Sequence, residues 1–258
     1  MIFDTHCHLN SEDLYKDIDN ILLKAKEAGV TKILVPGWDK ESSLLAIKIA
    51  NSYDGVYAAI GFHPTEVYEL TEEDFLSVMK NINDPKVVAV GEIGLDYHWC
   101  DDLNLREKQK EWFIRQIEFA NQYNKPIIIH NRDAFEDTLN ILKEHKPLHS
   151  GTMHCYSGSV ELLRDVINLG LYIGLDGPVT YKNAKTPKNV AKVVDIDKLL
   201  LETDSPYLAP HPLRGTINVP ANLYLIADEI SNQKEILTEK IIDATYNNAC
   251  RLFGIKDE

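Results

Sequence analysis

The chain has 258 residues, 44% of them hydrophobic and 26% charged, a composition typical of soluble globular proteins with one or two domains. Its net charge of −13 argues against a broad basic surface that wraps a nucleic-acid duplex, although bound divalent ions would still permit contact with a few phosphates. No apolar stretch approaches the length of a membrane span.

Short apolar runs rich in β-forming residues alternate along the chain with longer amphipathic stretches. The eight runs cover residues 1–6, 32–37, 56–61, 87–92, 126–131, 151–156, 171–176 and 198–203. Several are continuous blocks of Val, Ile and Leu, as expected of parallel strands that are buried on both faces. Apolar residues at helical spacing predict helices over 12–29, ended by Gly29, and over 103–123, with a closing helix over 235–253.

Eight strands, most of them followed by a helix and without an intervening linker, predict an α/β fold, the (β/α)8 TIM barrel. An open doubly wound sheet is the alternative. That fold usually carries a glycine-rich phosphate-binding turn after its first strand, whereas residues 5–8 here read Thr-His-Cys-His. The barrel is therefore the expected fold.

Imidazole and carboxylate side chains stand at the ends of five of these runs. They are His6, His8, Glu92, His130, His154 and Asp204. The C-terminal ends of the strands of a TIM barrel open onto one face, where active sites lie, so these side chains are expected to converge. A lone histidine is more often structural than a ligand, but six such placements predict a metal site.

Four imidazoles and two carboxylates, without a thiolate, suit Zn, Mn, Co or Ni, and also Mg if several waters remain bound. Six ligands exceed what one tetrahedral ion needs, so two ions are expected, with Glu92 as the bridge because a carboxylate has two oxygens. Paired ions can clamp a phosphoryl group and lower the pKa of water to about 7. The chain contains neither GxSxG nor a Walker motif, so hydrolysis by a two-metal-activated water is the predicted reaction.

Residues on the same rim are candidates for substrate contacts. His63 follows the third run, and because six ligands already suffice for two ions we assign it to the substrate. Arg132, just past the fifth run, and Arg214, in the loop HPLRG, could each hold a phosphate oxygen, with an ordinary salt bridge as the alternative. A loop aromatic such as Tyr97 or Trp99 could stack on a base, although core packing explains Tyr97 equally well.

The segment FDTHCHL places three possible ligands, His6, Cys7 and His8, in a row. Side chains of an extended backbone point alternately to opposite faces. We therefore expect Asp4, His6 and His8 to point into the barrel mouth and Cys7 to point toward the surrounding helices. The four cysteines form no CxxC pair and the N-terminus has no signal-peptide pattern, so free thiols in a cytoplasmic protein are expected.

The motifs FDTHCHL, GFHP, GEIGLDY, PIIIHNRDA, HCYSG and LLLETDSPYLAP, then RG and NVP, occur in this order from residue 3 to about residue 220. This ordered set resembles the TatD-type metal-dependent hydrolases, also called TatD-like deoxyribonucleases. The resemblance implies an amidohydrolase-type TIM barrel with metal at all six predicted ligands. It implies one ion at His6, His8, Asp204 and Glu92, and another at His130, His154 and Glu92.

The resemblance also implies a Mg-dependent deoxyribonuclease, often a 3′-to-5′ exonuclease on single strands, in which Asp204 acts as a base beside Glu92. We therefore expect one metallohydrolase domain over residues 1–258 that cleaves phosphodiester bonds of DNA, at short single strands or 3′ ends. We expect two divalent ions per chain, Mg or Mn in activity and Zn or Ni as bound metals. No membrane association is expected, and the protein is expected to be a monomer.

Two other functions remain open on the sequence. The first is hydrolysis of a small ester, lactone or amide, as in the wider amidohydrolase group. Many of those enzymes bridge their metals with a carboxylated lysine after the fourth strand, whereas Val90, Gly91 and Glu92 occupy this place here. The second is a non-catalytic metal-binding barrel, which the intact ligand set disfavours.

Overall fold

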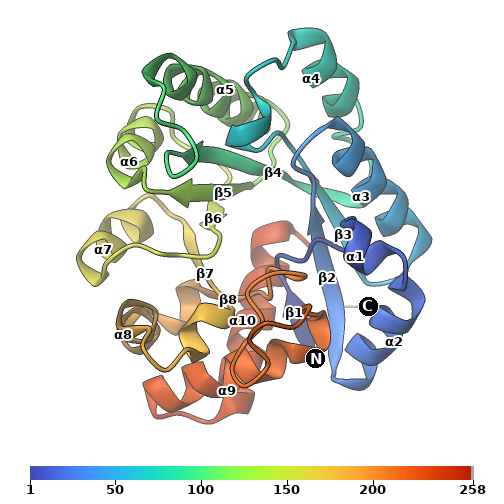
Figure 1. Cartoon of the computed structure of the whole chain (residues 1–258), viewed down its shortest axis with the longest axis vertical. Coiled ribbons are helices and arrows are strands. Elements are labelled where there is room, and N and C mark those ends of the chain that lie inside the picture. Colours follow the sequence, from blue (N-terminus) through green and yellow to red (C-terminus); the bar gives the residue numbers. More distant parts are fainter. Residues whose placement is uncertain (257–258) are drawn as a thin grey trace.

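The computed structural model describes residues 1–256, so residues 257 and 258 of the expected domain lie outside the described part of the chain. Eight strands form one sheet in chain order, and all neighbouring strands in it are parallel (Figure 1). They are β1 Ile2–Asp4, β2 Val30–Pro36, β3 Val56–Ile60, β4 Val87–Asp96, β5 Ile127–Arg132, β6 Gly151–Met153, β7 Tyr172–Leu175 and β8 Leu199–Leu201. Each expected apolar run overlaps one of these strands, and β2, β4 and β5 extend beyond their runs.

Helices surround the ring of strands. They are α1 Glu12–Tyr15, α2 Ile18–Glu27, α3 Lys40–Ser52, α4 Glu72–Met79, α5 Leu103–Gln122, α6 Phe135–Glu144, α7 Val160–Asn168, α8 Lys185–Val193, α9 Leu223–Lys234 and α10 Thr238–Phe253, with short 3₁₀ turns η1 Pro64–Glu66, η2 Gly177–Thr180, η3 Ile196–Lys198 and η4 Pro220–Asn222. Among the described helices, none has both the length and the apolar character that crossing a bilayer requires.

The helix expected over residues 12–29 is interrupted, which the apolar spacing did not predict. Asp17 has φ −132° and ψ 30°, outside the helical region, and it separates α1 from α2. Both parts still bury apolar side chains, because Leu14 and Ile18 lie in the same core. The chain then leaves α2 through Gly29 at φ +84°, a conformation that suits glycine.

The first and last strands close the ring. Beyond β1 and β8 the backbones continue side by side: Thr5 N donates to Leu201 O (3.0 Å), Asp204 N to His6 O (2.9 Å) and His8 N to Ser205 O (2.8 Å). These bonds supply the closure that distinguishes a barrel from an open sheet. The predicted TIM barrel is thus confirmed, and the doubly wound alternative is wrong.

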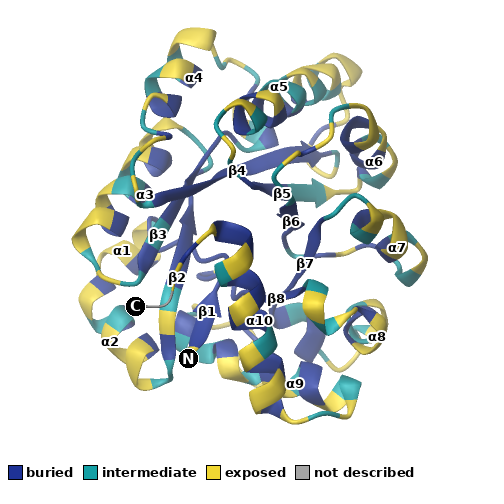
Figure 2. Cartoon of the chain, turned by 180° about the vertical axis from the view of Figure 1, so that it is seen from behind, coloured by how far each residue is buried: buried dark blue, intermediate teal, exposed yellow. Residues whose placement is uncertain are grey.

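Helix α10 covers the end of the barrel where the strands begin (Figure 2). Phe3, Leu34, Ile128 and Leu200, from four different strands, pack in one buried cluster with side chains of α10 such as Phe253. The other end of the barrel, which we call the mouth, is formed by the C-terminal strand ends. The fold therefore leaves one end of the barrel for polar side chains.

Two buried glutamines of α5 hold the ends of β3 and β4. Gln116 accepts from Phe62 N (2.8 Å) and donates to Phe62 O (3.0 Å), while Gln109 makes the same pair of bonds with Asp96 (2.9 and 3.0 Å). The two glutamines are seven residues apart and therefore lie on one face of the helix. Each side-chain amide satisfies a backbone N–H and C=O that would otherwise be buried without partners.

We expect Gln116→Met to lower the free energy of unfolding by about 1–3 kcal/mol, because the Phe62 N–H and C=O would remain buried and unpaired. Urea unfolding followed by circular dichroism measures this change. The matched control is Glu111→Gln on the exposed side of α5, which should leave the midpoint unchanged. Equal midpoints for both variants would contradict the role given to Gln116.

Candidate functional site

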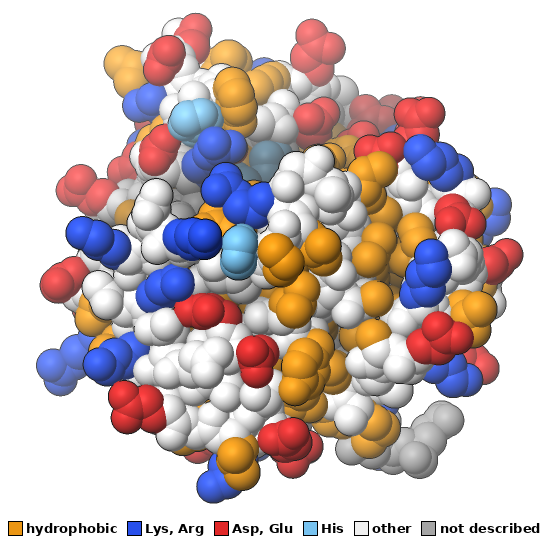
Figure 3. Space-filling model, turned by 60° about the horizontal axis from the view of Figure 1, so that its bottom comes forward, with side chains coloured by type: hydrophobic (Ala, Val, Ile, Leu, Met, Phe, Trp, Pro, Cys, Tyr) orange, Lys and Arg blue, Asp and Glu red, His pale blue; other side chains and the backbone are white. Residues whose placement is uncertain are grey.

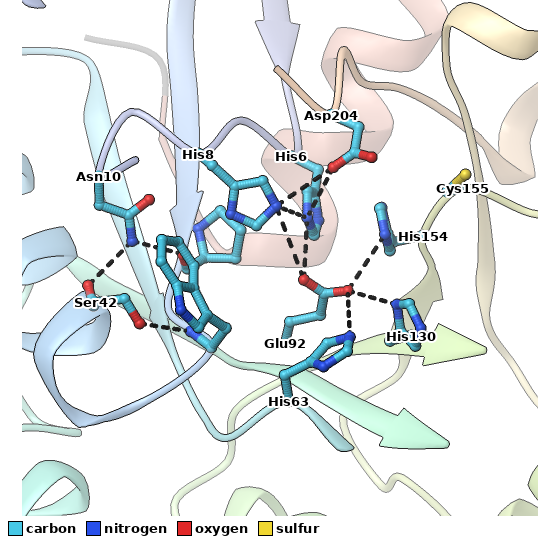
Figure 4. Close-up of polar contacts among 12 residues, drawn as sticks. His6, His8, Asn10, Ser42, His63, Glu92, His130, His154, Cys155 and Asp204 are labelled. Atoms are coloured by element: carbon cyan, nitrogen blue, oxygen red, sulfur yellow. Dashed lines mark hydrogen bonds and ion pairs between the residues drawn. The ribbon is translucent and has the colours of Figure 1, made fainter. Parts of the chain in front are cut away.

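All six predicted donor residues converge in the mouth of the barrel (Figure 4). His6 and His8 follow β1, Glu92 lies within β4, His130 lies within β5, and His154 and Asp204 follow β6 and β8. His6, His8, Glu92 and His154 are buried, and the other two are half-buried. Residues up to 198 positions apart in the chain therefore share one small polar cluster.

Glu92 stands at the centre of the cluster and divides it into two parts. Its Oε2 atom lies 3.5 Å from His6 Nε2 and 4.0 Å from His8 Nε2. Its Oε1 atom lies 2.8 Å from His130 Nδ1 and 3.4 Å from His154 Nε2. One carboxylate thus faces two sets of nitrogen atoms, each with a separate oxygen.

The first donor group consists of His6 Nε2, His8 Nε2, Asp204 Oδ1 and Glu92 Oε2. The two imidazole nitrogens are 3.2 Å apart, and Asp204 Oδ1 lies 3.7 Å from the first and 3.3 Å from the second. Four ligands around a tetrahedral ion with bonds of about 2.0–2.1 Å lie about 3.3–3.4 Å from one another. The group therefore has the spacing of a ligand set that could hold one ion.

The second donor group consists of His130 Nδ1, His154 Nε2 and Glu92 Oε1. Each imidazole also meets a carboxylate through its other nitrogen: His130 Nε2 lies 3.1 Å from Asp96 Oδ2. His154 Nδ1 lies 3.3 Å from Glu202 Oε1, close enough for an ion pair although the geometry is not that of a hydrogen bond. Carboxylates in this position fix the orientation of a metal-binding histidine and raise its basicity.

Asp96 and Glu202 were not predicted as part of the site. Asp96 ends β4, and Glu202 directly follows β8, two residues before Asp204. Both lie within motifs quoted above, Asp96 in GEIGLDY and Glu202 in LLLETDSPYLAP, but only packing shows what they touch. Glu202 also accepts a hydrogen bond from Cys155 N, and Gly174 leaves room for its carboxylate, because a Cβ there would meet Glu202 Cδ at 2.5 Å.

The carboxylates and imidazoles of the cluster shift one another's pKa values in the direction that favours a bound positive charge. Burial raises the pKa of Glu92, but His154, His130 and His6 outweigh burial and hold it well below its usual range. Burial lowers the pKa of His154, but Glu92, Glu202 and Asp204 raise it to about 10. The carboxylates thus stabilise a cation within the barrel mouth, and a metal ion would meet the same need.

His63 lies at the edge of the second donor group. Its Nε2 is 3.9 Å from Glu92 Oε1, and its ring is 4.3 Å from that of His130. Its Nδ1 meets Thr65 Oγ1 at 2.8 Å. Burial, and then His130, lowers the pKa of His63 to about 3, so the ring is neutral and able to accept or donate one hydrogen bond.

The two arginines predicted to contact substrate lie outside the donor cluster and are exposed. The guanidinium of Arg132 lies over the ring of Trp99 (5.5 Å), and that of Arg214 lies over the ring of Tyr181 (4.1 Å). Within residues 1–256 neither has a carboxylate within 4.0 Å, so the salt-bridge alternative is not supported. Tyr97 donates to Asp137 (2.6 Å) and packs against the core, which favours its structural interpretation.

The expected alternation along FDTHCHL is partly wrong. His6 and His8 share a face and Cys7 is fully buried in the apolar core, as expected. Asp4 does not join them: its carboxylate accepts hydrogen bonds from Thr203 N (2.9 Å) and Oγ1 (2.6 Å) and from His6 N (3.3 Å). Strand β1 ends at Asp4, so strict alternation does not extend to His6.

Comparison with known proteins identifies the family of this chain. The chain matches the family described as "TatD related DNase" over residues 3–254. It is 45% identical over 256 residues to the uncharacterized metal-dependent hydrolase YabD of Bacillus subtilis, covering 99% of this chain and 100% of that protein. It is 36% identical over 261 residues to the uncharacterized metal-dependent hydrolase YcfH of Escherichia coli, covering 98% and 96% of the two chains.

Among solved structures, YJJV, a TatD homologue from Escherichia coli, superimposes with a TM-score of 0.94 at 31% identity, covering 99% of this chain and 98% of that chain. A TatD-family hydrolase from Entamoeba histolytica gives a TM-score of 0.85 at 24% identity over 99% of both chains, which shows a common fold. With its barrel, its cluster of histidines and carboxylates and these relatives, the chain belongs to the TatD family of metal-dependent hydrolases.

Proposed function

We propose that this protein is a deoxyribonuclease that uses two divalent ions to hydrolyse phosphodiester bonds of single-stranded DNA or of 3′ ends. The observation that carries the proposal is the position of Glu92, whose two oxygens face two separate sets of donors. Two ions that share a carboxylate are the arrangement found in phosphodiester-cleaving enzymes. The name of the matched family points to the same substrate.

The donor atoms fit two such ions. His6, His8 and Asp204 would hold one ion with Glu92 Oε2, and His130 and His154 would hold the other with Glu92 Oε1. His6 Nδ1 and His8 Nδ1 have no hydrogen-bond partner among the described residues, so only Nε2 of each ring faces a group of donors. Imidazole and carboxylate ligands suit Mg or Mn in activity and Zn or Ni as bound metals.

Bound divalent ions would polarise the phosphodiester and make water acidic enough to attack at neutral pH. The chain itself supplies a base: Asp204 turns Oδ1 to His6 and His8, and its Oδ2 has no hydrogen bond within residues 1–256. This free oxygen is available to take a proton from the attacking water. His63, Arg132 and Arg214 would contact the phosphates of the strand.

We expect Glu92→Gln to reduce hydrolysis of end-labelled single-stranded DNA by about 100-fold or more. Loss of the shared negative charge weakens both ion sites and removes several kcal/mol of transition-state stabilisation. The measurement is a matrix of Mg, Mn and Zn against single-stranded DNA, duplex DNA, RNA and small esters. Glu73→Gln, an exposed glutamate on α4, is the control. Nuclease activity that is equal in both variants would come from a contaminant and refute the proposal.

Glu202→Gln is expected to weaken metal binding by about 10–100-fold, because the neutral amide no longer supports His154. The amide oxygen can still accept the hydrogen bond from Cys155 N, so the fold should be retained. Competition with a chromogenic chelator measures affinity without any enzymatic assay, and thermal unfolding checks the fold. Affinity equal to that of the wild type would remove Glu202 from the metal site.

Cys7→Ala should keep both ions, whereas His6→Ala should lose one. The Cys7 thiol is fully buried in the apolar core, and burial raises its pKa well above the usual range, which opposes a thiolate ligand. Metal content per folded chain, measured by atomic emission, tests both variants. Loss of a stoichiometric ion from folded Cys7→Ala would show that the thiol is a ligand.

A further inference from the structure

Two exposed aromatic side chains stand at the mouth of the barrel, beside the donor cluster. Trp99 is 70% exposed and Tyr207 is 59% exposed. Trp99 lies in the loop after β4, and Tyr207 lies in the loop after β8. In a ring of eight strands in chain order, β4 and β8 are four places apart, so these loops rise on opposite sides of the mouth.

Trp99 is joined to the second donor group through one carboxylate. Its backbone N donates to Asp96 Oδ1 (3.1 Å), while Asp96 Oδ2 meets His130 Nε2 (3.1 Å). The loop that carries the indole is therefore held in place by the residue that orients a candidate ligand. Arg132, two residues past His130, lies over the indole at 5.5 Å and adds a positive charge beside it.

Tyr207 has the corresponding relation to the first donor group. Its backbone N donates to Asp204 O (2.9 Å), and its ring centroid lies 5.9 Å from that of His8. Each donor group is thus linked to one large, exposed aromatic residue, Trp99 through its backbone and Asp96, and Tyr207 through its backbone and its ring. Single exposed aromatic residues are common on protein surfaces, but a matched pair on either side of a candidate active site is a specific arrangement.

We propose that Trp99 and Tyr207 are stacking platforms for unpaired nucleobases on either side of a phosphodiester bound at the donor cluster. This inference rests on the proposed function and specifies its substrate as single-stranded DNA, because bases within a duplex have no free face to offer. Aromatic rings bind bases of any sequence by stacking, and an arginine beside the ring can bind the neighbouring phosphate.

The distribution of charge is compatible with this substrate despite the net charge of −13. On the face shown in Figure 3, Lys and Arg side chains gather around a histidine and beside exposed hydrophobic side chains. Stacking would supply affinity that a protein without an extensive basic groove lacks.

The test is a double-mutant cycle in which each protein variant is measured with an intact strand and with a strand that lacks one base. Trp99→Ala and Tyr207→Ala are compared with Leu103→Ala, 72% exposed at the start of α5, and Tyr224→Ala, 46% exposed on α9. The substrate is a single-stranded oligodeoxynucleotide, intact or with one abasic residue placed stepwise from its 3′ end. Activity is measured as kcat/KM, and binding of a phosphorothioate strand to the metal-loaded protein is measured by fluorescence anisotropy.

We expect each platform variant to weaken binding of the intact strand by about 5- to 150-fold, with no further loss on a strand that lacks the stacked base. The two control variants should bind as the wild type does, and duplex DNA should bind more weakly than the single strand. Equal losses on intact and abasic strands, no loss at all, or equal binding of duplex would overturn the inference.

Failure of the proposed function gives a different result. If the protein binds the single strand through Trp99 but cleaves it with none of the metals, the stacking platforms stand and the nuclease function is refuted. If Trp99→Ala and Tyr207→Ala leave cleavage unchanged, the nuclease function stands and the stacking platforms are refuted.

Discussion

The hydrogen bonds that close the barrel between residues 5–8 and 201–205 are the constraint on which the site depends. They pair backbone segments that lie about 200 positions apart in the chain, and Asp204 N donates to His6 O at 2.9 Å. The same backbone contact therefore completes the fold and brings Asp204 to His6 and His8. Asp4 strengthens this seam from below, because its buried carboxylate accepts from the backbone and the hydroxyl of Thr203. If the barrel opened at this seam, Asp204 would separate from His6 and His8, and the first donor group would be lost. His130 and His154, on and after β5 and β6, would stay together, but their position relative to the first group would no longer be fixed.

The donor cluster concentrates negative charge where water is largely excluded. Asp176, which follows β7, belongs to the same buried surroundings, and burial together with Glu202 and Asp204 raises its pKa well above the usual range. In a protein interior such carboxylates require protons, histidinium ions or metal ions to balance them. The imidazoles provide part of this balance, which explains the raised pKa of His154. Divalent ions would neutralise the remaining negative charge of the buried carboxylates. They would also supply the chemistry that activates water for hydrolysis.

The side chains at the mouth form an inner and an outer layer, which contribute differently to function. The inner layer of histidines and carboxylates is held by strand ends, and it determines the class of chemistry. The outer layer consists of Trp99, Tyr207 and Arg214 on loops and Arg132 at the end of β5, and in the proposed function it selects the substrate. The same barrel supports many unrelated reactions through changes in such loops. A shared fold at low identity therefore does not define the substrate, which depends on the exposed side chains at the mouth.

The sequence by itself determined the strand order, the barrel and the six donor residues, because apolar blocks of strand length and polar residues at their ends are local signals. It also determined that Cys7 differs from its two neighbours. The tertiary structure alone decided what depends on distant contacts: the carboxylates Asp96 and Glu202 behind the histidines, the place of Asp4 beneath the seam, and the paired hydrogen bonds of Gln109 and Gln116. In a linear chain these are ordinary polar residues of strands and helices. Their roles arise only when the barrel closes, because a buried polar group takes its partner from whichever segment the fold places within about 3 Å.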